Sequence, residues 1–337
     1  MYKPFMSEGM ERGNGLSHYV LLKMPHLIEC SERWFNQKMK RFCEIKEKVC
    51  TGQRKTIAVA AAADLPVLMA VRDAVNGGLA NAVLVGAKED IEKKMKQAGL
   101  GHEHIEIIAA ANPAAAVGEA VQLVRSQKAH ILMKGMVSTA VFMRAVLSKE
   151  EGLNIGNELT HISVFEVPKI HRLILMTDPA MHMYPELKEK VKMLQAAVKV
   201  CRALEIEDPK AAAVCAVEVV NPAMPPTIDA AALAQMSNRG QIPGITVDGP
   251  LALDAALSPE AAAHKKLHNS VAGQADVLLM PNIETGNVMW KTLAYMGEAK
   301  IAGVITGASA PIVLTSRSDS PDTKLNSIAL ALLLALS

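Results

Sequence analysis

From residue 39 onward, short apolar runs alternate with longer segments in which apolar residues recur at helical spacing. The apolar runs predict strands at 56–61, 82–85, 104–108 and 130–133. Each strand is followed by a predicted helix, and these helices begin near residues 65, 88, 113 and 138, after a first helix at 39–49. Apolar strands separated by amphipathic helices indicate a mostly parallel sheet with helices on both faces, which places the chain in the α/β class.

The middle of the chain interrupts this alternation. Two apolar runs at 159–167 and 172–176 are joined by a short link, which predicts an antiparallel hairpin. The alternation then resumes, with further strands predicted at 211–220, 245–247, 276–280 and 311–314. The helices predicted in this part cover 187–204, 229–238, 251–266, 288–296 and 321–336.

A chain of 337 residues exceeds the usual size of a single core, so two domains are expected. We place the first α/β domain at 39–155 plus 311–337 and the second at 156–310. Residues 1–38 hold five of the eleven aromatic residues and have no sustained period. They are interpreted as an N-terminal extension, either poorly ordered or an interface arm.

Composition narrows the class of function. Half of the residues are hydrophobic, about a fifth are charged, and the net charge is only +2, so no surface for nucleic acid is expected. The longest apolar run, 328–336, is too short to span a bilayer, and nothing near Met1 resembles a signal peptide. The five cysteines are odd in number and form no CxxC pair, so a reduced, cytoplasmic protein without membrane contact is expected.

The start of the last predicted helix has the features of an anion site. Ser320 suits the N-cap and Pro321 the first helical position, so free backbone N–H groups should face the polar loop before the helix. Arg317 offers a planar fork for phosphate oxygens, and Asp319 or Asp322 could accept a proton. The alternative is an ordinary capped helix.

Several more polar clusters follow predicted strands, where open α/β sheets bind ligands. One contains Lys134, Gly135 and Thr139, with Arg144 on the following helix; a plain strand-to-helix turn is the alternative. Asp248 stands in a tight turn. A further cluster puts two amides, a hydroxyl and a lysine around a glycine, which exceeds what a simple turn requires; its members are Asn282, Thr285, Gly286, Asn287 and Lys291.

Taken in order, these clusters make the chain resemble the phosphate acetyl/butyryltransferase family over residues 39–337. The resemblance includes Thr177-Asp178-x-Ala180, Met236-Ser237-x-x-Gly240, Val247-Asp248-Gly249 and the Ser316-Arg317 pair. The run Ser-Arg-Ser-Asp-Ser at 316–320 is more similar to phosphate butyryltransferases than to phosphate acetyltransferases, which usually carry Ser-Arg-Gly-Cys-Ser.

The resemblance implies a reversible reaction of acyl-CoA with phosphate that yields acyl phosphate and CoA, with both as substrates and with neither a metal nor a cofactor. It also implies an isopropylmalate-dehydrogenase-like fold, a cleft between two domains, and a homodimer or higher homo-oligomer. Ser316 would bond the reacting carbonyl or thiol, while Arg317 and Arg144 would hold anions. The family's catalytic aspartate falls on Thr323, which leaves Asp319 and Asp322 as candidate bases.

Butyryl-CoA is the expected substrate, with phosphate acetyltransferase activity as the first alternative. A hydroxy-acid oxidoreductase of the same fold would need metal-binding aspartates and an adenine-binding loop, and neither is visible in the sequence. No GxGxxG follows a strand and no GxxxxGK[ST] occurs. A non-catalytic CoA-binding protein is the third alternative, because an aspartate is missing at position 323.

Overall fold

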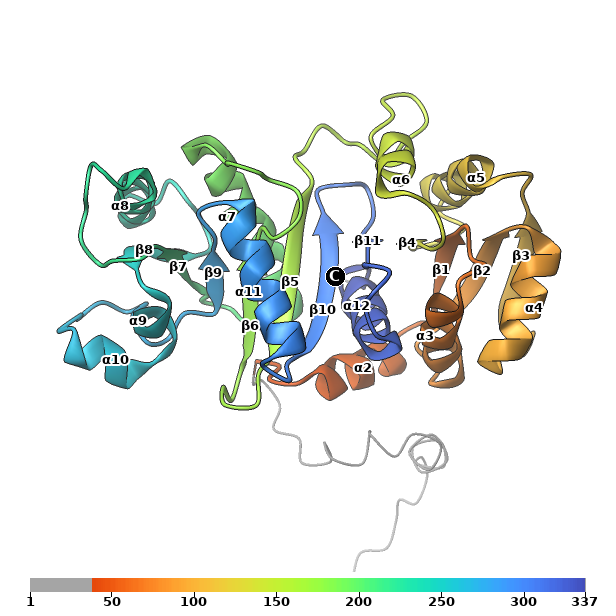
Figure 1. Ribbon diagram of the computed structural model, residues 1–337, viewed down its shortest axis with the longest axis horizontal. Helices are drawn as coiled ribbons and strands as arrows, with labels where there is room; N and C mark the ends of the chain where they lie inside the picture. Colours follow the sequence, from red (N-terminus) through yellow and green to blue (C-terminus); the bar gives the residue numbers. More distant parts are fainter. Residues whose placement is uncertain (1–37, 337) are drawn as a thin grey trace, which may run out of the picture.

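The computed structural model describes residues 38–336 and arranges them as a sheet with helices on both faces (Figure 1). The strands are β1 (Lys55–Ala60), β2 (Ala80–Gly86), β3 (Ile105–Ala109), β4 (Ile131–Lys134), β5 (Thr160–Glu166), β6 (Leu173–Thr177), β7 (Lys210–Val214), β8 (Thr246–Leu251), β9 (Val277–Leu279), β10 (Lys300–Thr306) and β11 (Ile312–Val313). The predicted N-terminal extension, 1–38, lies almost wholly outside the described residues.

The helices cover the sheet in the order that the sequence pattern predicts, with some shifted ends. They are α2 (Phe42–Thr51), α3 (Leu65–Asn76), α4 (Lys88–Ala98), α5 (Pro113–Arg125), α6 (Thr139–Val146), α7 (Leu187–Ala203), α8 (Pro225–Asn238), α9 (Leu253–Leu257), α10 (Pro259–His264), α11 (Ile283–Tyr295) and α12 (Pro321–Leu334). Among the described residues, no helix is long and apolar enough to cross a membrane.

The strands join in one sheet with the order β3-β2-β1-β4-β11-β10-β5-β6-β9-β7-β8. From β3 to β11 neighbouring strands are parallel, and from β6 to β8 they are parallel again. The antiparallel pairs lie in the middle, where β10 pairs with β11 and β5 and where β5 pairs with β6. The predicted hairpin is therefore confirmed, as is the mostly parallel sheet.

The predicted domain limit at residue 311 coincides with the change from the antiparallel strand β10 to the parallel strand β11. The sheet is continuous across this point, so the division into domains remains a prediction.

The two faces of the sheet carry differently divided apolar cores. One apolar core runs along the whole of one face, whereas the opposite face carries two separate clusters, one on each half.

Alternating side chains of the strands supply these layers. In β1, Ile57 and Val59 face the long core, while Ala58 and Ala60 face the opposite cluster. Helix α12 lies within the long core, and its residues from Lys324 to Leu333 are all buried. A helix that is apolar on all sides belongs in the interior, which explains the position of this final segment.

Several elements differ from the sequence-based predictions. Strand β10 has no counterpart among the predicted strands, since its seven residues include Gly303 and carry no clear alternation. Helix α11 begins at Ile283 rather than 288, because the Asn282 side chain caps it. The predicted helix 251–266 is two short helices, since Pro259 lacks an N–H group and Ser258 caps α10. Strand β7 ends at Val214 rather than 220.

Candidate active site

A cavity of about 760 Å³ opens where the central strands end. Its wall is built from the end of β4, the start of α6, the loop after β6, helix α11 and the loop between β11 and α12. Seven of the candidate residues line it, namely Lys134, Thr139, Asn287, Lys291, Ser316, Arg317 and Asp319. Segments far apart in the sequence therefore bring hydroxyl, cationic and carboxylate groups to one space.

The loop before α12 forms a closed turn on this wall. The Ser316 N–H group donates to Oδ2 of Asp319 at 2.7 Å, and the Asp319 N–H group donates back to the Ser316 carbonyl at 3.3 Å. The hydroxyls of Ser316 and Ser318 lie 3.0 Å apart. Ser316, Arg317 and Ser318 are exposed, so the turn presents a hydroxyl and a guanidinium to a ligand.

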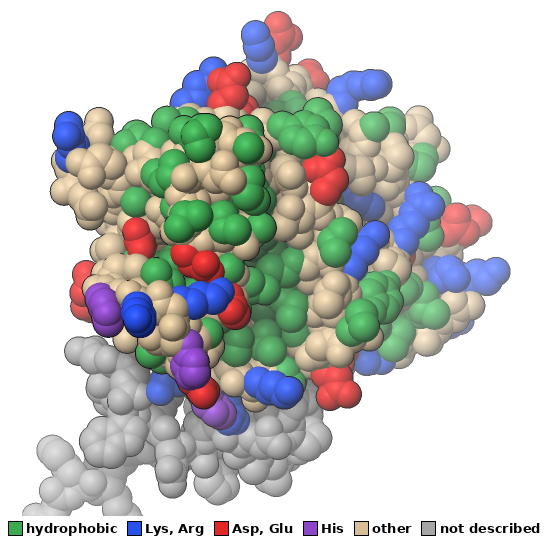
Figure 2. All heavy atoms as spheres, turned by 60° about the vertical axis from the view of Figure 1, so that its left-hand side comes forward, with side chains coloured by type: hydrophobic (Ala, Val, Ile, Leu, Met, Phe, Trp, Pro, Cys, Tyr) green, Lys and Arg blue, Asp and Glu red, His purple; other side chains and the backbone are tan. Residues whose placement is uncertain are grey.

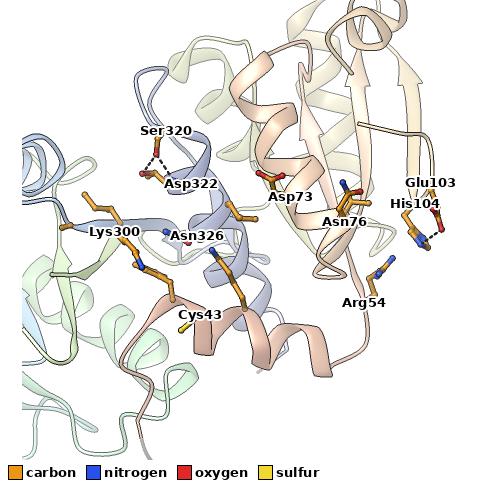
Figure 3. Close-up of a pocket in the computed structure, with 17 residues that line it drawn as sticks. Cys43, Arg54, Asp73, Asn76, Glu103, His104, Lys300, Ser320, Asp322 and Asn326 are labelled. Carbon is orange, nitrogen blue, oxygen red and sulfur yellow. Dashed lines mark hydrogen bonds and ion pairs between the residues drawn. The ribbon is translucent and has the colours of Figure 1, made fainter. Parts of the chain in front are cut away.

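The start of α12 has the predicted cap. The Ser320 hydroxyl accepts from the Thr323 N–H group at 3.1 Å, and Pro321 stands in the first turn. The two candidate aspartates lie on different sides of this helix end. Asp319 lines the cavity described above, whereas Asp322 lines a second cavity of about 940 Å³ beside α2 and α3, together with Lys300 (Figure 3).

Burial raises the pKa of the Asp319 carboxyl, although the hydrogen bond from the Ser316 N–H group and the charge of Lys324 oppose this change. A carboxyl with a raised pKa is a stronger proton acceptor when it is ionised. Asp319 also stands two residues from Arg317, the predicted anion ligand. Of the two aspartates, Asp319 is therefore the one that shares a cavity with Ser316 and Arg317.

The loop after β4 is held by its own lysine. Lys134 is buried, and its Nζ donates to the carbonyls of Gly135 at 3.2 Å and Val137 at 3.1 Å. Burial is the main cause that lowers the pKa of Lys134, and the charge of Arg317 contributes. A Cβ atom on Gly135 would collide with the Ala61 carbonyl oxygen, so glycine is required by packing at this point.

Two further candidates in this region have different surroundings. Ser138, rather than Thr139, caps α6, since its Oγ accepts from the Val141 N–H group at 3.3 Å. Thr139 is the first helical residue and lines the cavity. Arg144 is exposed in the last turn of α6 and is absent from the described lining of the cavity.

The cluster around residue 282 lies in the first turns of α11, not in a loop before the helix. Oδ1 of Asn282 accepts from the N–H group of Thr285 at 2.9 Å and from its hydroxyl at 2.7 Å. A Cβ atom on Gly286 would lie 2.8 Å from the Asp178 carbonyl oxygen. Asn282 and Thr285 therefore serve the start of the helix, and Gly286 lets the helix pack closely against the loop after β6, while Asn287 and Lys291 line the cavity.

Asp248 lies in β8, the strand at the far edge of the sheet from β3. Burial raises its pKa, but it does not belong to the described lining of the cavity that holds Ser316 and Arg317. Asp248 therefore stands in a strand rather than in the predicted tight turn, and it is separate from the seven candidates that line the cavity.

The chain is similar to known proteins in both sequence and structure. A family model described as phosphate acetyl/butaryl transferase matches residues 41–117 and 112–332. The chain belongs to this family. It is 54% identical to a phosphate butyryltransferase of Clostridium acetobutylicum, over 88% of this chain and 99% of that protein. It is 40% identical to a phosphate acetyltransferase of Thermotoga maritima, over 87% of this chain and 100% of that one.

Solved structures show the same architecture. A branched-chain phosphotransacylase from Enterococcus faecalis aligns with a TM-score of 0.75 at 31% identity, covering 83% of this chain and 99% of that one. A 4-hydroxythreonine-4-phosphate dehydrogenase from Klebsiella pneumoniae aligns with a TM-score of 0.51 at 13% identity, over 83% of this chain and 99% of that one. The fold is therefore isopropylmalate-dehydrogenase-like, as predicted.

Sequence reasoning missed several polar residues on or beside the cavity, among them three that are buried. His161 in β5 lines it, and burial lowers the pKa of this histidine, so the ring is neutral near pH 7. Thr315 also lines it, and its buried hydroxyl has no hydrogen-bond partner among the described residues. Lys324 is buried behind the turn. A histidine in a strand and a lysine in a helix carry no motif that would single them out.

The described residues contain no group of three or more His, Cys, Asp or Glu side chains that could hold a metal ion. The polar groups that do meet in the cavity are hydroxyls, one amide, one imidazole, cations and one carboxylate. Such a set suits an anionic substrate with a reacting carbonyl.

Proposed function

We propose that the chain is a phosphate acyltransferase that converts a short-chain acyl-CoA and phosphate into acyl phosphate and CoA, reversibly. The main structural observation in support of this proposal is the closed turn that presents Ser316, Arg317 and Asp319 on one wall of the cavity. Butyryl-CoA is the favoured substrate, which is supported by the 54% identity to a phosphate butyryltransferase. We also propose that CoA and phosphate act here as substrates and that no cofactor takes part.

In the direction that forms CoA thioester, Asp319 accepts the thiol proton and the sulfur attacks the acyl carbon. The carbon–oxygen bond to phosphate breaks, and phosphate leaves. In the opposite direction a phosphate oxygen attacks the thioester carbon, the carbon–sulfur bond breaks, and Asp319 returns the proton to the leaving thiolate. A free thiol is only a few per cent ionised at neutral pH, so a proton acceptor is needed.

Arg317 holds the phosphate in this proposal, and its positive charge offsets the repulsion between the phosphate and the Asp319 carboxylate. The Ser316 hydroxyl donates to the oxygen on which negative charge develops, and one such donor contributes about 3 kcal/mol. Lys134 and Lys291 line the same cavity and add positive charge for the phosphates of CoA or for free phosphate.

We propose that the chain forms a homodimer through the face that carries α11. Within Ile283–Tyr295 the buried residue is Gly286, so this helix exposes apolar side chains. Val288 is 65% exposed and Met296, the residue that ends the helix, is 81% exposed. Hydrophobic side chains gather in patches on this side of the molecule (Figure 2). A second copy would cover them, which sedimentation velocity of the purified protein tests directly.

The reaction itself is tested with purified protein and butyryl-CoA, by following free thiol. Thiol release is expected only when phosphate is present, with a higher kcat/KM for butyryl-CoA than for acetyl-CoA. Release that is independent of phosphate, or no release from any short acyl-CoA, would contradict the proposal. A clear preference for acetyl-CoA would favour phosphate acetyltransferase activity, which the 40% identity to such an enzyme supports.

The same preparation distinguishes an acyltransferase from an oxidoreductase and from a binding protein. A hydroxy-acid oxidoreductase would change the absorbance of a nicotinamide cofactor, and a non-catalytic binding protein would bind CoA without turnover. We also propose a cytoplasmic location, because CoA and phosphate are the proposed substrates.

A further inference from the structure

We propose that Lys324 is a positioning residue that fastens both ends of the Ser316–Asp319 turn and keeps a fixed positive charge behind it. This inference rests on the proposed function, because it assigns a role within the same site. Lys324 is 2% exposed and belongs to α12, the helix in the apolar core. The residue therefore links the turn at the surface to the interior of the protein.

The contacts of the ammonium group carry the inference. Nζ of Lys324 donates to the carbonyl oxygen of Ser316 at 3.0 Å and to that of Asp319 at 2.6 Å. The hydrogen bonds within the turn join its own residues to one another. The lysine thus connects the first and last residues of the turn to the helix that follows.

A buried ammonium group is costly unless it gains strong hydrogen bonds. Both acceptors described above are backbone carbonyls, which carry no net charge, so the positive charge of Lys324 is not cancelled by them. Lys134 repeats this arrangement on the opposite loop, where its Nζ bonds two carbonyls. Two loops of the cavity are therefore each held by a buried lysine.

The charged groups that face Lys324 determine its effect on proton transfer. Burial lowers the pKa of Lys324, and the charges of Asp319 and Asp64 oppose this change, while the charge of Lys324 helps to lower the pKa of Lys134. The charge of Lys324 also lowers the pKa of Asp319, against the larger effect of burial. Loss of this charge would raise the pKa of Asp319 and reduce its ionised fraction at neutral pH.

The test compares Lys324→Met with Lys190→Met. Lys190 is a matched control, because it is also buried but pairs with Asp229 at 2.6 Å, away from the cavity lining. We expect Lys324→Met to lower kcat/KM for phosphate and butyryl-CoA by about 100-fold, the usual effect of displacing a catalytic group by about 1 Å. Lys190→Met should keep near-normal activity at a temperature where both variants are folded by circular dichroism.

A pH profile separates positioning from general stability. The profile is measured in the direction in which butyryl phosphate and CoA form butyryl-CoA, where Asp319 acts as the base. The acid limb of kcat/KM then reports the ionisation of Asp319, so it should move to higher pH in Lys324→Met and stay in place in Lys190→Met. Lys324→Arg keeps the charge but changes the geometry, so it should lose activity with an unmoved acid limb. An unchanged kcat/KM and an unchanged acid limb in folded Lys324→Met would overturn the inference.

Binding of inorganic phosphate, measured by isothermal titration calorimetry, keeps this test independent of turnover. Should the unmodified protein show no phosphate-dependent thiol release, the proposed function fails. The role of Lys324 is then judged by binding alone: about 10-fold weaker phosphate binding in Lys324→Met than in Lys190→Met supports it, and equal binding overturns it. If Lys324→Met does not fold, Lys324→Arg is compared with the unmodified protein in both measurements.

Discussion

Two helix starts of this protein look alike in sequence and differ in what their polar residues do. Before α12, Ser320 caps the helix, and the functional candidates Ser316 and Arg317 precede the cap in a separate turn. At α11, the candidate Asn282 is itself the cap, and the candidate Thr285 donates its N–H group and its hydroxyl to the Asn282 side chain. A polar residue at a cap serves the backbone of its own helix, so polar residues outside the cap are better functional candidates.

The two helices also differ in burial. Helix α12 is buried from Lys324 to Leu333, which gives the turn before it a rigid support. Helix α11 exposes Val288 and contributes Asn287 and Lys291 to the cavity from its surface. We therefore expect catalysis to depend on the turn before α12, and substrate contacts and assembly to depend on α11.

The largest effect on stability is expected from the core of α12. Leu330 is fully buried in the long core, so Leu330→Ala should lower the free energy of unfolding by about 2–5 kcal/mol. Val288→Ala in α11 should change it by less than about 0.5 kcal/mol in the monomer, because the side chain is 65% exposed. Urea denaturation measures both. Equal losses would show that the two helices are equally supported.

A substitution in the turn should weaken the use of phosphate without lowering the stability of the protein. Arg317→Ala removes an exposed guanidinium, so we expect phosphate use to fall by about 100-fold while the melting temperature stays nearly unchanged. Initial rates at varied phosphate concentrations give the result. Lys291→Ala is the counterpart on α11 and should have a smaller effect on phosphate than on acyl-CoA. A reversed order would move the phosphate site to α11.

A change at the cap of α11 should have the smallest effect. Asn282→Ala removes the two hydrogen bonds to Thr285 and should cost about 1 kcal/mol of stability. Since the side chain serves the helix, kcat should remain within about threefold of normal where the protein is folded. Thermal unfolding and the thiol assay, run on the same sample, decide this. A loss of kcat without a loss of stability would make Asn282 a substrate ligand.

Local signals made part of the structure predictable. Ser320 and Pro321 predict the start of α12 because a cap depends on neighbouring residues alone. Strand β10 could not be predicted in the same way, since its pairing with β5 joins segments more than 130 residues apart. The motif order from 39 to 337 predicted the family and the fold, which the comparisons confirm.

The site was predictable only in part for a similar reason. Sequence spacing put Ser316, Arg317 and Asp319 together, and they share a cavity wall. Sequence spacing could not choose between Asp319 and Asp322. One lies before the start of the helix and the other lies three residues later, inside the helix, and the two residues line different cavities. The buried position of Lys324 also depends on the packing of α12, which spacing does not reveal.

The central claim is that the turn before α12, through Asp319, carries the proton transfer. Asp319→Asn and Asp322→Asn test it most directly, as a pair assayed for phosphate-dependent thiol release from butyryl-CoA. Asp319→Asn is expected to lower kcat by about 100-fold or more, the usual contribution of a general acid or base, with little change in KM for phosphate. Asp322→Asn should retain near-normal kcat. Near-normal kcat in Asp319→Asn, together with a large loss in Asp322→Asn, would contradict the account and move the base to the second cavity.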